Sequence, residues 1–478
     1  MGTKIHCDRD IDATHASFSA SVILELASAS HGRYEPPHDS HQPLVPLAEL
    51  LGRSSRVACP RTAASTISIT RFLDAALKHH TWKALPLLYR FITFFLFALA
   101  ILAGIHSYFW VRLVRDTQVP LPYRAWTTAV CVALACSVPI SLMAPRLMPR
   151  PWAAYAAWPG YIWIGFMLLL LAALVGTDLL RLILAIGRAV SSRPQLDPAA
   201  RLRLARALAV AVVVVSAVLG SHSIFQGLRE PVVRELRIAI PGLPTALAGT
   251  TIVQLTDLHI GATKSRNFAS DIVRRSNALS PDVVAITGDL VEGRFGSGRE
   301  DTLPLAALRA RQGVFMVTGN HEYYSGLREW LPELQRLGIR VLRNEHVVID
   351  GDRGGGWELA GIEDWNGGSV EPDGGPDLAR ALAGHDPTRP LVLLSHQPRA
   401  IYSAAQAGVA LMLSGHTHGG QIWPFKYLVR LQQPFLEGLH KVGQTQLYVS
   451  PGTGYWGPPM RLGTRGEITR ITLVSDHL

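Results

Sequence analysis

Residues 251–259 read Thr-Ile-Val-Gln-Leu-Thr-Asp-Leu-His, a short β-branched run that leads directly into an Asp-x-His motif. Four further strand-like runs lead into polar motifs in the same way. They are 282–287 before Gly288-Asp289, 314–318 before Gly319-Asn320-His321-Glu322, 391–394 before Ser395-His396, and 410–413 before Ser414-Gly415-His416-Thr417-His418-Gly419-Gly420. Loops at strand ends of α/β scaffolds are where functional groups lie. These five stretches therefore decide both the expected fold and the expected site.

Helical spacing separates the first strand-like runs, at 267–279, 303–311 and 327–337. This βαβα order is typical of a layered α/β domain. Later strand-like runs follow without long helices between them, at 340–342, 346–350, 357–361, 446–449 and 467–474. They indicate a second sheet, so we predict a two-sheet sandwich flanked by helices over residues 251–478. Residues 229–250 are expected to form a linker and a first strand.

The first half of the chain has a different texture. Four stretches lack Asp, Glu, Lys and Arg, at 91–111, 125–145, 151–177 and 207–228. A membrane-spanning helix needs about 20 such residues, so we predict four transmembrane helices within residues 85–228. Pro139 and Pro145 make the second stretch the least regular. Residues 1–84 show no sustained period and are expected to form a poorly structured tail.

Charge is distributed unevenly along the 478 residues. Residues 1–236 hold 23 Lys and Arg against 13 Asp and Glu, whereas residues 237–478 hold 23 against 23. A nucleic-acid-binding half needs a basic face, so the composition argues against nucleic acid as a partner. Because all four cysteines lie before residue 137, no disulfide framework supports the second half.

Positive charge near the spans does not decide on which side of the membrane the C-terminal half lies. An even number of spans places both ends of the chain on one side. The loops on the opposite side carry nine Arg, and the loops and flanks on the side of the chain ends carry nine Lys or Arg. The densest cluster lies between the third and fourth spans, which by the positive-inside rule favours an extracytoplasmic C-terminal half.

Each polar motif taken alone has an ordinary explanation. An Asp after a strand is commonly a turn or a helix cap, and a single loop His is more often solvated or packed than a metal ligand. Together they offer imidazole, carboxylate and amide groups without thiolates, which suits Mn, Fe or Zn. The eight candidate side chains are enough for two ions.

The set and order of these motifs resembles the calcineurin-like metallophosphoesterase superfamily over residues 251–421. Longer forms at 254–261, 285–291, 317–324 and 413–421, and the tail at 446–463, resemble a bacterial subgroup fused to a membrane anchor. The resemblance implies the metallophosphoesterase fold and two divalent metal ions. One ion would be held by Asp257, His259, Asp289 and His418, and the second by Asp289, Asn320, His396 and His416, with Asp289 shared.

The resemblance also gives His321 a position facing the phosphate, as a transition-state stabiliser or as a proton donor to the leaving oxygen. Glu322 would either orient His321 or cap a helix. Two cations about 3.5–4 Å apart lower the pKa of a bridging water, so that hydroxide exists near neutral pH. The expected catalytic residues are His321, Asp289 and Asn320. Arg294 is expected to be a solvated surface residue rather than a phosphate contact.

The segment 421–435 is rich in large apolar side chains and begins directly after the Gly-Gly that follows His418. It is either ordinary core packing or an apolar wall for acyl chains, extended by Tyr455, Trp456 and Met460. With a membrane anchor, the second interpretation favours a lipid-linked phosphate or pyrophosphate. Proteins resembling this subgroup are linked to hydrolysis of UDP-2,3-diacylglucosamine in lipid A biosynthesis. That substrate needs a cytoplasmic site. The arginines between the third and fourth spans instead favour an extracytoplasmic C-terminal half.

The sequence thus favours a membrane-anchored, two-metal phosphodiesterase or pyrophosphatase in a bacterial inner membrane. Its expected partners are the lipid bilayer and a phosphorylated small molecule or lipid. The alternative is a non-catalytic, metal-stabilised sensor or scaffold, which a missing ligand or a replaced His321 would have favoured. A transporter built by the four spans is a third hypothesis, and the lack of charged residues within them argues against it.

Overall fold

The computed structural model describes residues 87–475 except 150, 193, 195, 351–355 and 372–373. The chain divides into two units, residues 1–97 and 98–478. The expected N-terminal tail, residues 1–84, lies outside the described residues.

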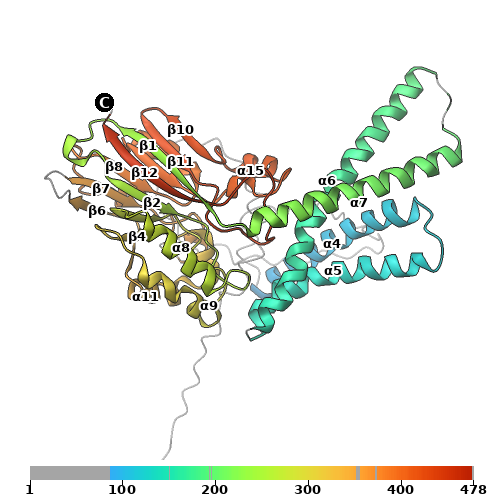
Figure 1. Ribbon diagram of the computed structural model, residues 1–478, viewed down its shortest axis with the longest axis horizontal. Helices are drawn as coiled ribbons and strands as arrows, with labels where there is room; N and C mark the ends of the chain where they lie inside the picture. The colour runs from blue at the N-terminus through green and yellow to red at the C-terminus, as the bar shows by residue number, and fades with distance from the viewer. Residues whose placement is uncertain are drawn as a thin grey trace, which may run out of the picture. The chain divides into compact units, whose positions relative to one another are not determined.

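Within the described residues, four long helices precede the sheets (Figure 1). They are α4 (Leu87–Trp110), which continues as a π-helical turn to Arg115, α5 (Tyr123–Leu147), α6 (Trp152–Val190) and α7 (Pro198–Leu228). Each contains a segment long and apolar enough to cross a membrane, and α5 runs unbroken through both of its prolines. The third helix continues to Val190 rather than ending near 177, because a charge-free run marks only the apolar part of a helix that extends beyond it.

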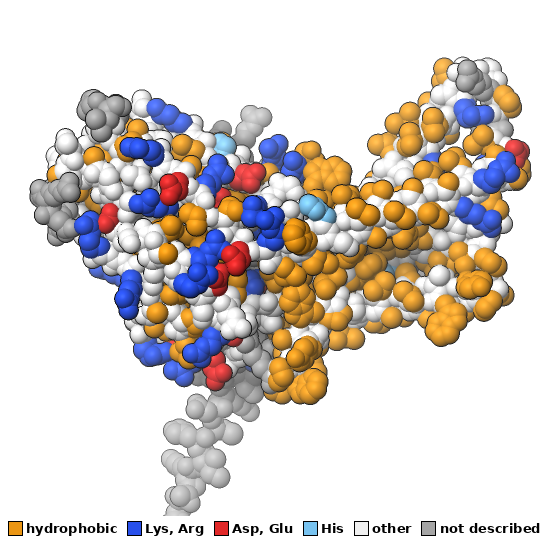
Figure 2. Space-filling model, viewed as in Figure 1, with side chains coloured by type: hydrophobic (Ala, Val, Ile, Leu, Met, Phe, Trp, Pro, Cys, Tyr) orange, Lys and Arg blue, Asp and Glu red, His pale blue; other side chains and the backbone are white. Residues whose placement is uncertain are grey.

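Large apolar side chains lie exposed along these helices, as the orange surface in Figure 2 shows. Trp126 is 72% exposed and Phe225 is 61% exposed. Apolar surface of this extent is unfavourable in water at roughly 25 cal/mol per Å², and contact with lipid removes that penalty. The protein is therefore a membrane protein.

Two six-stranded sheets follow. The first has the order β1-β12-β2-β3-β4-β5, formed by β1 (Val232–Ile240), β12 (Glu467–Ser475), β2 (Thr251–Leu255), β3 (Val283–Ile286), β4 (Val314–Met316) and β5 (Ile339–Val341). The second has the order β10-β11-β9-β8-β7-β6, formed by β10 (Gly438–Val442), β11 (Thr445–Val449), β9 (Leu411–Ser414), β8 (Leu391–Leu394), β7 (Gly356–Gly361) and β6 (Glu345–Asp350). The chain thus has the expected two-sheet sandwich.

The main hydrophobic core contains buried side chains from both sheets. Ile252 and Ala285 of the first sheet belong to the same buried cluster as Val392 and Leu413 of the second. On the outer face of the first sheet, a separate hydrophobic cluster includes residues of α8 (Arg266–Ala278) and α11 (Leu327–Arg336). On the outer face of the second sheet, another cluster includes residues of α13 (Leu378–Ala381) and α14 (Ile401–Gln406). Burial on both faces explains why the strands read as continuous apolar runs rather than alternating ones.

Strand register brings the polar loops to one edge. β2, β3, β4 and β5 are parallel, with Leu255 opposite Ile286, and β8 and β9 are parallel, with Leu394 opposite Leu413. The carboxyl ends of neighbouring parallel strands lie together, so the loops that follow these pairs share an edge of their sheet. The first strand, β1, pairs with β12 along its whole length and so is part of the first sheet.

One helix prediction is wrong. Residues 303–311 were expected to be helical, but the α-helix lies earlier, as α9 (Phe295–Thr302), and only a 3-10 turn covers Leu303–Ala307. Pro304 has no backbone N–H with which to continue α9, and the 3-10 turn ends before Leu308, whose backbone is extended with ψ at 134°. The remaining helices are α10 (Asn320–Ser325), α12 (Gly367–Val370) and α15 (Lys426–Gln432).

Candidate metal centre

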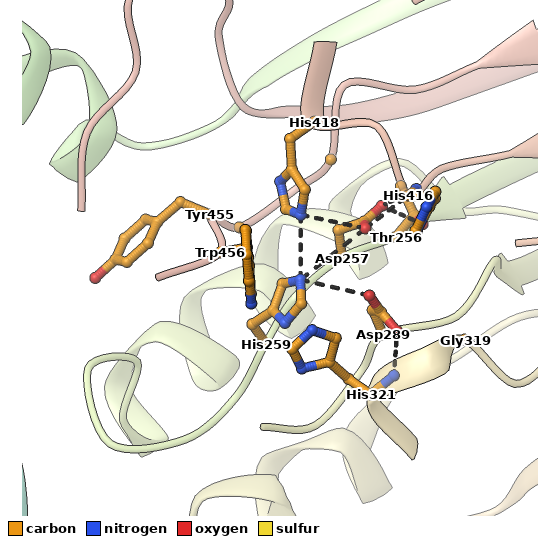
Figure 3. A network of polar contacts seen from close by, with 12 residues as sticks. Thr256, Asp257, His259, Asp289, Gly319, His321, His416, His418, Tyr455 and Trp456 are labelled. Carbon is orange, nitrogen blue, oxygen red and sulfur yellow. Dashed lines mark hydrogen bonds and ion pairs between the residues drawn. The ribbon is translucent and has the colours of Figure 1, made fainter. Parts of the chain in front are cut away.

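The strand-end side chains converge from five loops. Asp257 and His259 follow β2, Asp289 follows β3, and Asn320 and His321 open α10 after β4. His396 follows β8, and His416 and His418 follow β9. All but His416 are buried, with exposed fractions of 7% or less, and His416 is partly buried. The two sheets therefore contribute side chains to one place, as Figure 3 shows for most of them.

A first cluster forms around the nitrogen atoms of two histidines. His259 Nε2 lies 3.1 Å from His418 Nε2, and His418 Nε2 lies 3.3 Å from Asp257 Oδ1. The same nitrogen of His259 is 3.7 Å from Asp289 Oδ2. Donors bound to one ion at about 2.1 Å would lie roughly 3 Å apart, so this spacing suits a shared cation.

A second cluster lies on the other side of Asp289. His396 Nε2 is 3.2 Å from Asp289 Oδ2, 3.2 Å from Asn320 Oδ1 and 3.2 Å from His416 Nδ1. The oxygen of Asp289 that faces His259 is thus the one that faces His396. Its other oxygen, Oδ1, accepts a hydrogen bond of 2.8 Å from the backbone N–H of His321. Asp289 is anchored through one oxygen and shared between two clusters through the other.

The backbone around the clusters is strained where the side chains converge. Asp257, His259, Asp289, His416 and His418 have φ between 48° and 71°. L-residues rarely adopt this region, and such strain costs on the order of 1–3 kcal/mol per residue. Strain concentrated at five converging polar residues is typical of a functional site.

Neighbouring groups orient the side chains of the two clusters. His396 Nδ1 donates to the Thr287 carbonyl over 2.8 Å, which directs Nε2 toward Asp289. The Thr256 hydroxyl donates to Asp257 Oδ2 over 2.7 Å, and the backbone N–H of His416 donates to the same carboxylate over 3.0 Å. Partners of this kind fix the tautomer and the direction of metal ligands.

Burial sets the charge states of the clusters. It lowers the pKa of His259, His416 and His418 well below the usual value, which favours the neutral imidazole that binds a metal ion. Burial also lowers the pKa of His396, but the Asp289 carboxylate outweighs it and holds that pKa well above the usual value. The pKa of Asp289 is held well below its usual range because the neighbouring histidines, His396 first, outweigh the effect of burial.

The donor set fits divalent transition metals. Groups of three ligand-bearing residues that could hold an ion are Asp257, His259 and His418; His259, Asp289 and His321; and Asp289, His396 and His416. Imidazole and carboxylate donors without thiolates are those preferred by Zn, Mn and Fe. The residues present therefore fit such ions.

His321 lies beside the first cluster rather than within the second. Its ring centroid is 4.5 Å from that of His259, edge to face, and 6.2 Å from that of Trp456. Figure 3 shows the His321 ring next to His259. It is therefore positioned to meet a group bound at the clusters.

Glu322 caps a helix and ties together two loops, one of the two roles left open by the sequence. Its carboxylate accepts backbone N–H groups of Gly319 at 2.7 Å, Asp289 at 2.9 Å, Leu290 at 2.8 Å and Val291 at 3.2 Å. Burial raises the pKa of Glu322, while these donors act in the opposite direction by stabilising its ionised form. The residue holds the loop that carries Asp289 against the start of α10.

Arg461 is a supporting residue that the motifs did not reveal. Its guanidinium is 1% exposed and donates to the carbonyls of Pro451 at 2.8 Å, Gly452 at 3.3 Å and His418 at 3.4 Å. It fastens the loop after β11 to the His418 loop. No pattern near residue 461 marks it, since its partners are backbone carbonyls from distant loops. Arg294 is exposed, as expected.

The apolar segment 421–435 is only partly core. Ile422 is 4% exposed, and Phe435 packs against a buried cluster. Trp423, Tyr427 and Leu431 are 45%, 53% and 70% exposed. Of the residues expected to extend an apolar wall, Met460 and Tyr455 are buried, and Trp456 faces His321. Ordinary core packing therefore does not explain the segment as a whole.

The similarity of this chain to known proteins agrees with a metal-binding site. Residues 250–420 match the family described as calcineurin-like phosphoesterase. A Bos taurus protein named "Transmembrane protein with metallophosphoesterase domain" is 35% identical over 445 residues, 88% of this chain and 97% of its own length. An "Uncharacterized metallophosphoesterase" of Helicobacter pylori is 39% identical over 255 residues, 53% of this chain and 66% of its own. These relatives come from animals as well as bacteria.

Among solved structures, a dimetal phosphatase from Danio rerio is similar at 14% identity, with a TM-score of 0.29. The similarity covers 43% of this chain and 88% of that one.

Proposed function

Because this chain belongs to the calcineurin-like metallophosphoesterases, and is therefore a metal-dependent phosphoester hydrolase, we propose that it cleaves a phosphodiester or pyrophosphate bond at a binuclear centre bridged by Asp289. The observation that carries the proposal is the position of Asp289 Oδ2. It is 3.7 Å from His259 Nε2 and 3.2 Å from His396 Nε2, so one carboxylate oxygen serves both clusters.

Two sets of side chains would hold the ions. The first set is Asp257, His259, Asp289 and His418, and the second is Asp289, Asn320, His396 and His416. Bound divalent ions would supply Lewis acidity toward phosphate oxygens and a water molecule of lowered pKa. The chain's own contribution is to hold the seven proposed ligands on strand-end loops, and the packing of the two sheets fixes the positions of these loops.

His321 is the proposed proton donor or charge partner for the leaving oxygen. Its ring stands beside the first cluster, while its backbone N–H is tied to Asp289 Oδ1. The tie to Asp289 thus runs through the backbone of His321 and not through its imidazole. A histidine placed there offsets the charge that grows on the leaving group.

The proposed substrate is a lipid-linked or nucleotide-linked phosphate. The support is the membrane anchor together with exposed apolar side chains a few residues beyond His418. UDP-2,3-diacylglucosamine is one compound of this class, and its hydrolysis would require a cytoplasmic domain. A C-terminal reporter fusion that is active on only one side of the membrane tests this, because an extracytoplasmic signal would eliminate nucleotide-activated substrates.

Activity and metal content test the proposal together. The full-length protein in detergent micelles, loaded with Mn²⁺, is assayed on bis(p-nitrophenyl) phosphate and analysed for bound metal. We expect about two ions per chain in the wild type, loss of turnover and of both ions in Asp289→Ala, and loss of one ion each in His259→Ala and His416→Ala. His346→Ala is the control, because this histidine lies on the edge strand β6 and bonds to the Ala381 carbonyl.

Equal turnover in wild type and Asp289→Ala would refute the catalytic proposal. Full metal occupancy with no turnover on any phosphoester would instead favour the metal-stabilised sensor or scaffold.

A further inference from the structure

The short helix α15 (Lys426–Gln432) carries an apolar face that the rest of the described chain leaves exposed. Tyr427, Leu428 and Leu431 are 53%, 43% and 70% exposed, and none of the residues of α15 is buried. At 3.6 residues per turn, positions i, i+1 and i+4 lie on one face of a helix. Trp423, 45% exposed, adds an indole just before the helix. Four large apolar side chains thus gather at one place outside all the cores.

Basic residues accompany the apolar face. Lys426 lies 5.4 Å from the Tyr427 ring centroid, and Arg430 is exposed on the adjoining face. The helix contains no acidic residue. An apolar face with Trp, Tyr and Leu and basic residues at its border is typical of helices that lie in the headgroup region of a bilayer. Seven residues are too few to span a membrane, so α15 could contact a bilayer only from an interfacial position.

The segment that precedes α15 is attached to residues that contact the membrane helices. The backbone N–H of Trp423 donates to the Leu462 carbonyl over 3.0 Å, and Ile422 forms an isolated β-bridge with Leu462. Ile422 and Met460 share a buried cluster with Leu169 of α6.

Arg461, which lies between Met460 and Leu462, shows at which level along α7 this loop contacts the membrane helices. The Arg461 N–H donates to the Ser223 carbonyl of α7 over 2.9 Å. Ser223 lies within the charge-free run 207–228, five residues before the end of α7, or about 7–8 Å along the helix axis. The loop at 458–462 is therefore level with the last turns of the apolar run, close to the plane where hydrocarbon meets headgroups. A helix fastened to that loop lies near the same plane.

We propose that the α15 face formed by Trp423, Tyr427, Leu428 and Leu431 inserts into the interfacial layer of the bilayer that holds the four helices. Lys426 and Arg430 then contact anionic lipid headgroups. Since α15 begins eight residues after His418, insertion holds this side of the metal centre at the membrane surface. The proposal does not depend on the reaction catalysed, because it concerns only what covers this face.

Spin labels on the full-length protein test the proposal. Cys7, Cys59, Cys131 and Cys136 are replaced by alanine, and single labels are attached at Leu431→Cys, at Tyr427→Cys and at the control Val348→Cys, in nanodiscs that contain phosphatidylglycerol. Val348 is 44% exposed on β6, at the opposite edge of the second sheet. Collision rates with lipid-soluble oxygen and with a water-soluble nickel chelate are then measured.

The expected result is that nickel accessibility at 431 and 427 falls about threefold or more below that at 348, while oxygen accessibility stays high. Two α15 labels guard against a local effect of one substitution. Nickel accessibility at both α15 positions equal to that at 348 would overturn the proposal. Protection from both reagents, with dipolar broadening between labels, would also overturn it, in favour of a second copy of the chain on this face.

Discussion

Replacing Glu322 by glutamine removes one of the two oxygens that hold the loop carrying Asp289. In the protein, Oε2 accepts from Asp289 and Gly319, and Oε1 accepts from Leu290 and Val291. An amide has one oxygen, so two of the four buried N–H groups lose their acceptor and face an NH₂ group instead. Hydrogen bonds to a charged group contribute about 1.5–3 kcal/mol each, so the free energy of unfolding should fall by about 3–6 kcal/mol.

The measurement is the Tm of full-length Glu322→Gln in detergent micelles with saturating Mn²⁺. For a domain of this size, we expect the Tm to fall by about 10 °C, with loss of bound metal because the shared ligand is displaced. Glu345→Gln is the control, because that side chain is 46% exposed and lies 3.9 Å from its arginine partner. An unchanged Tm and metal content, with reduced turnover alone, would refute this reasoning and show that Glu322 acts only on His321.

Three further predictions follow from the same geometry. A Cβ at Gly319 would overlap the Asp289 carboxylate, so Gly319→Ala should lower kcat about 100-fold, whereas Gly296→Ala, with nothing within 4 Å, should leave kcat unchanged; equal rates would contradict the close approach. Burial lowers the pKa of Lys264 to about 7, so the unfolded chain binds the extra proton between that value and 10.5, and wild-type stability gains from rising pH across that window. Lys264→Met should therefore raise the Tm at pH 6 by more than at pH 10. The same rise at both pH values would contradict this reasoning, and so would the same pH dependence in the control Lys441→Met, whose side chain is exposed. Chelation of the metals should lower the wild-type Tm, since an ion present at 100 times its Kd stabilises the folded state by about 2.7 kcal/mol. Chelation should leave the Tm of Asp289→Ala unchanged. A wild-type Tm that does not respond to the chelator would contradict metal binding.

Much of the fold could be predicted because its local signals agree with its tertiary structure. The strand-like runs at 251–255 and 391–394 are the strands β2 and β8, since continuous apolar runs suit strands buried on both faces. The metal-centre side chains could be proposed because parallel strands deliver their carboxyl ends to one edge. The helix expected at 303–311 is instead a 3-10 turn over Leu303–Ala307, because Pro304 cannot continue α9 and the backbone is extended from Leu308.

Other features depend on contacts between distant segments. Arg461 bonds to carbonyls of the loops that carry His418 and Gly452, so no spacing near residue 461 could reveal it. Glu322 could be read as a cap or as a partner of His321, and only the position of the Asp289 loop decides. The exposed face of α15 was open to two interpretations, because apolar side chains on a short helix suit a core as well as a bilayer.

The central claim, that one carboxylate is shared by two ions, is tested most directly by X-ray absorption at the metal edge of the Zn²⁺- or Mn²⁺-loaded full-length protein. The account predicts imidazole and oxygen neighbours near 2.1 Å and a metal–metal scattering shell at about 3.5 Å, which vanishes in His416→Ala because that variant keeps only one ion. A wild-type spectrum with first-neighbour scattering but no metal–metal shell, from protein loaded with two ions per chain, would contradict it.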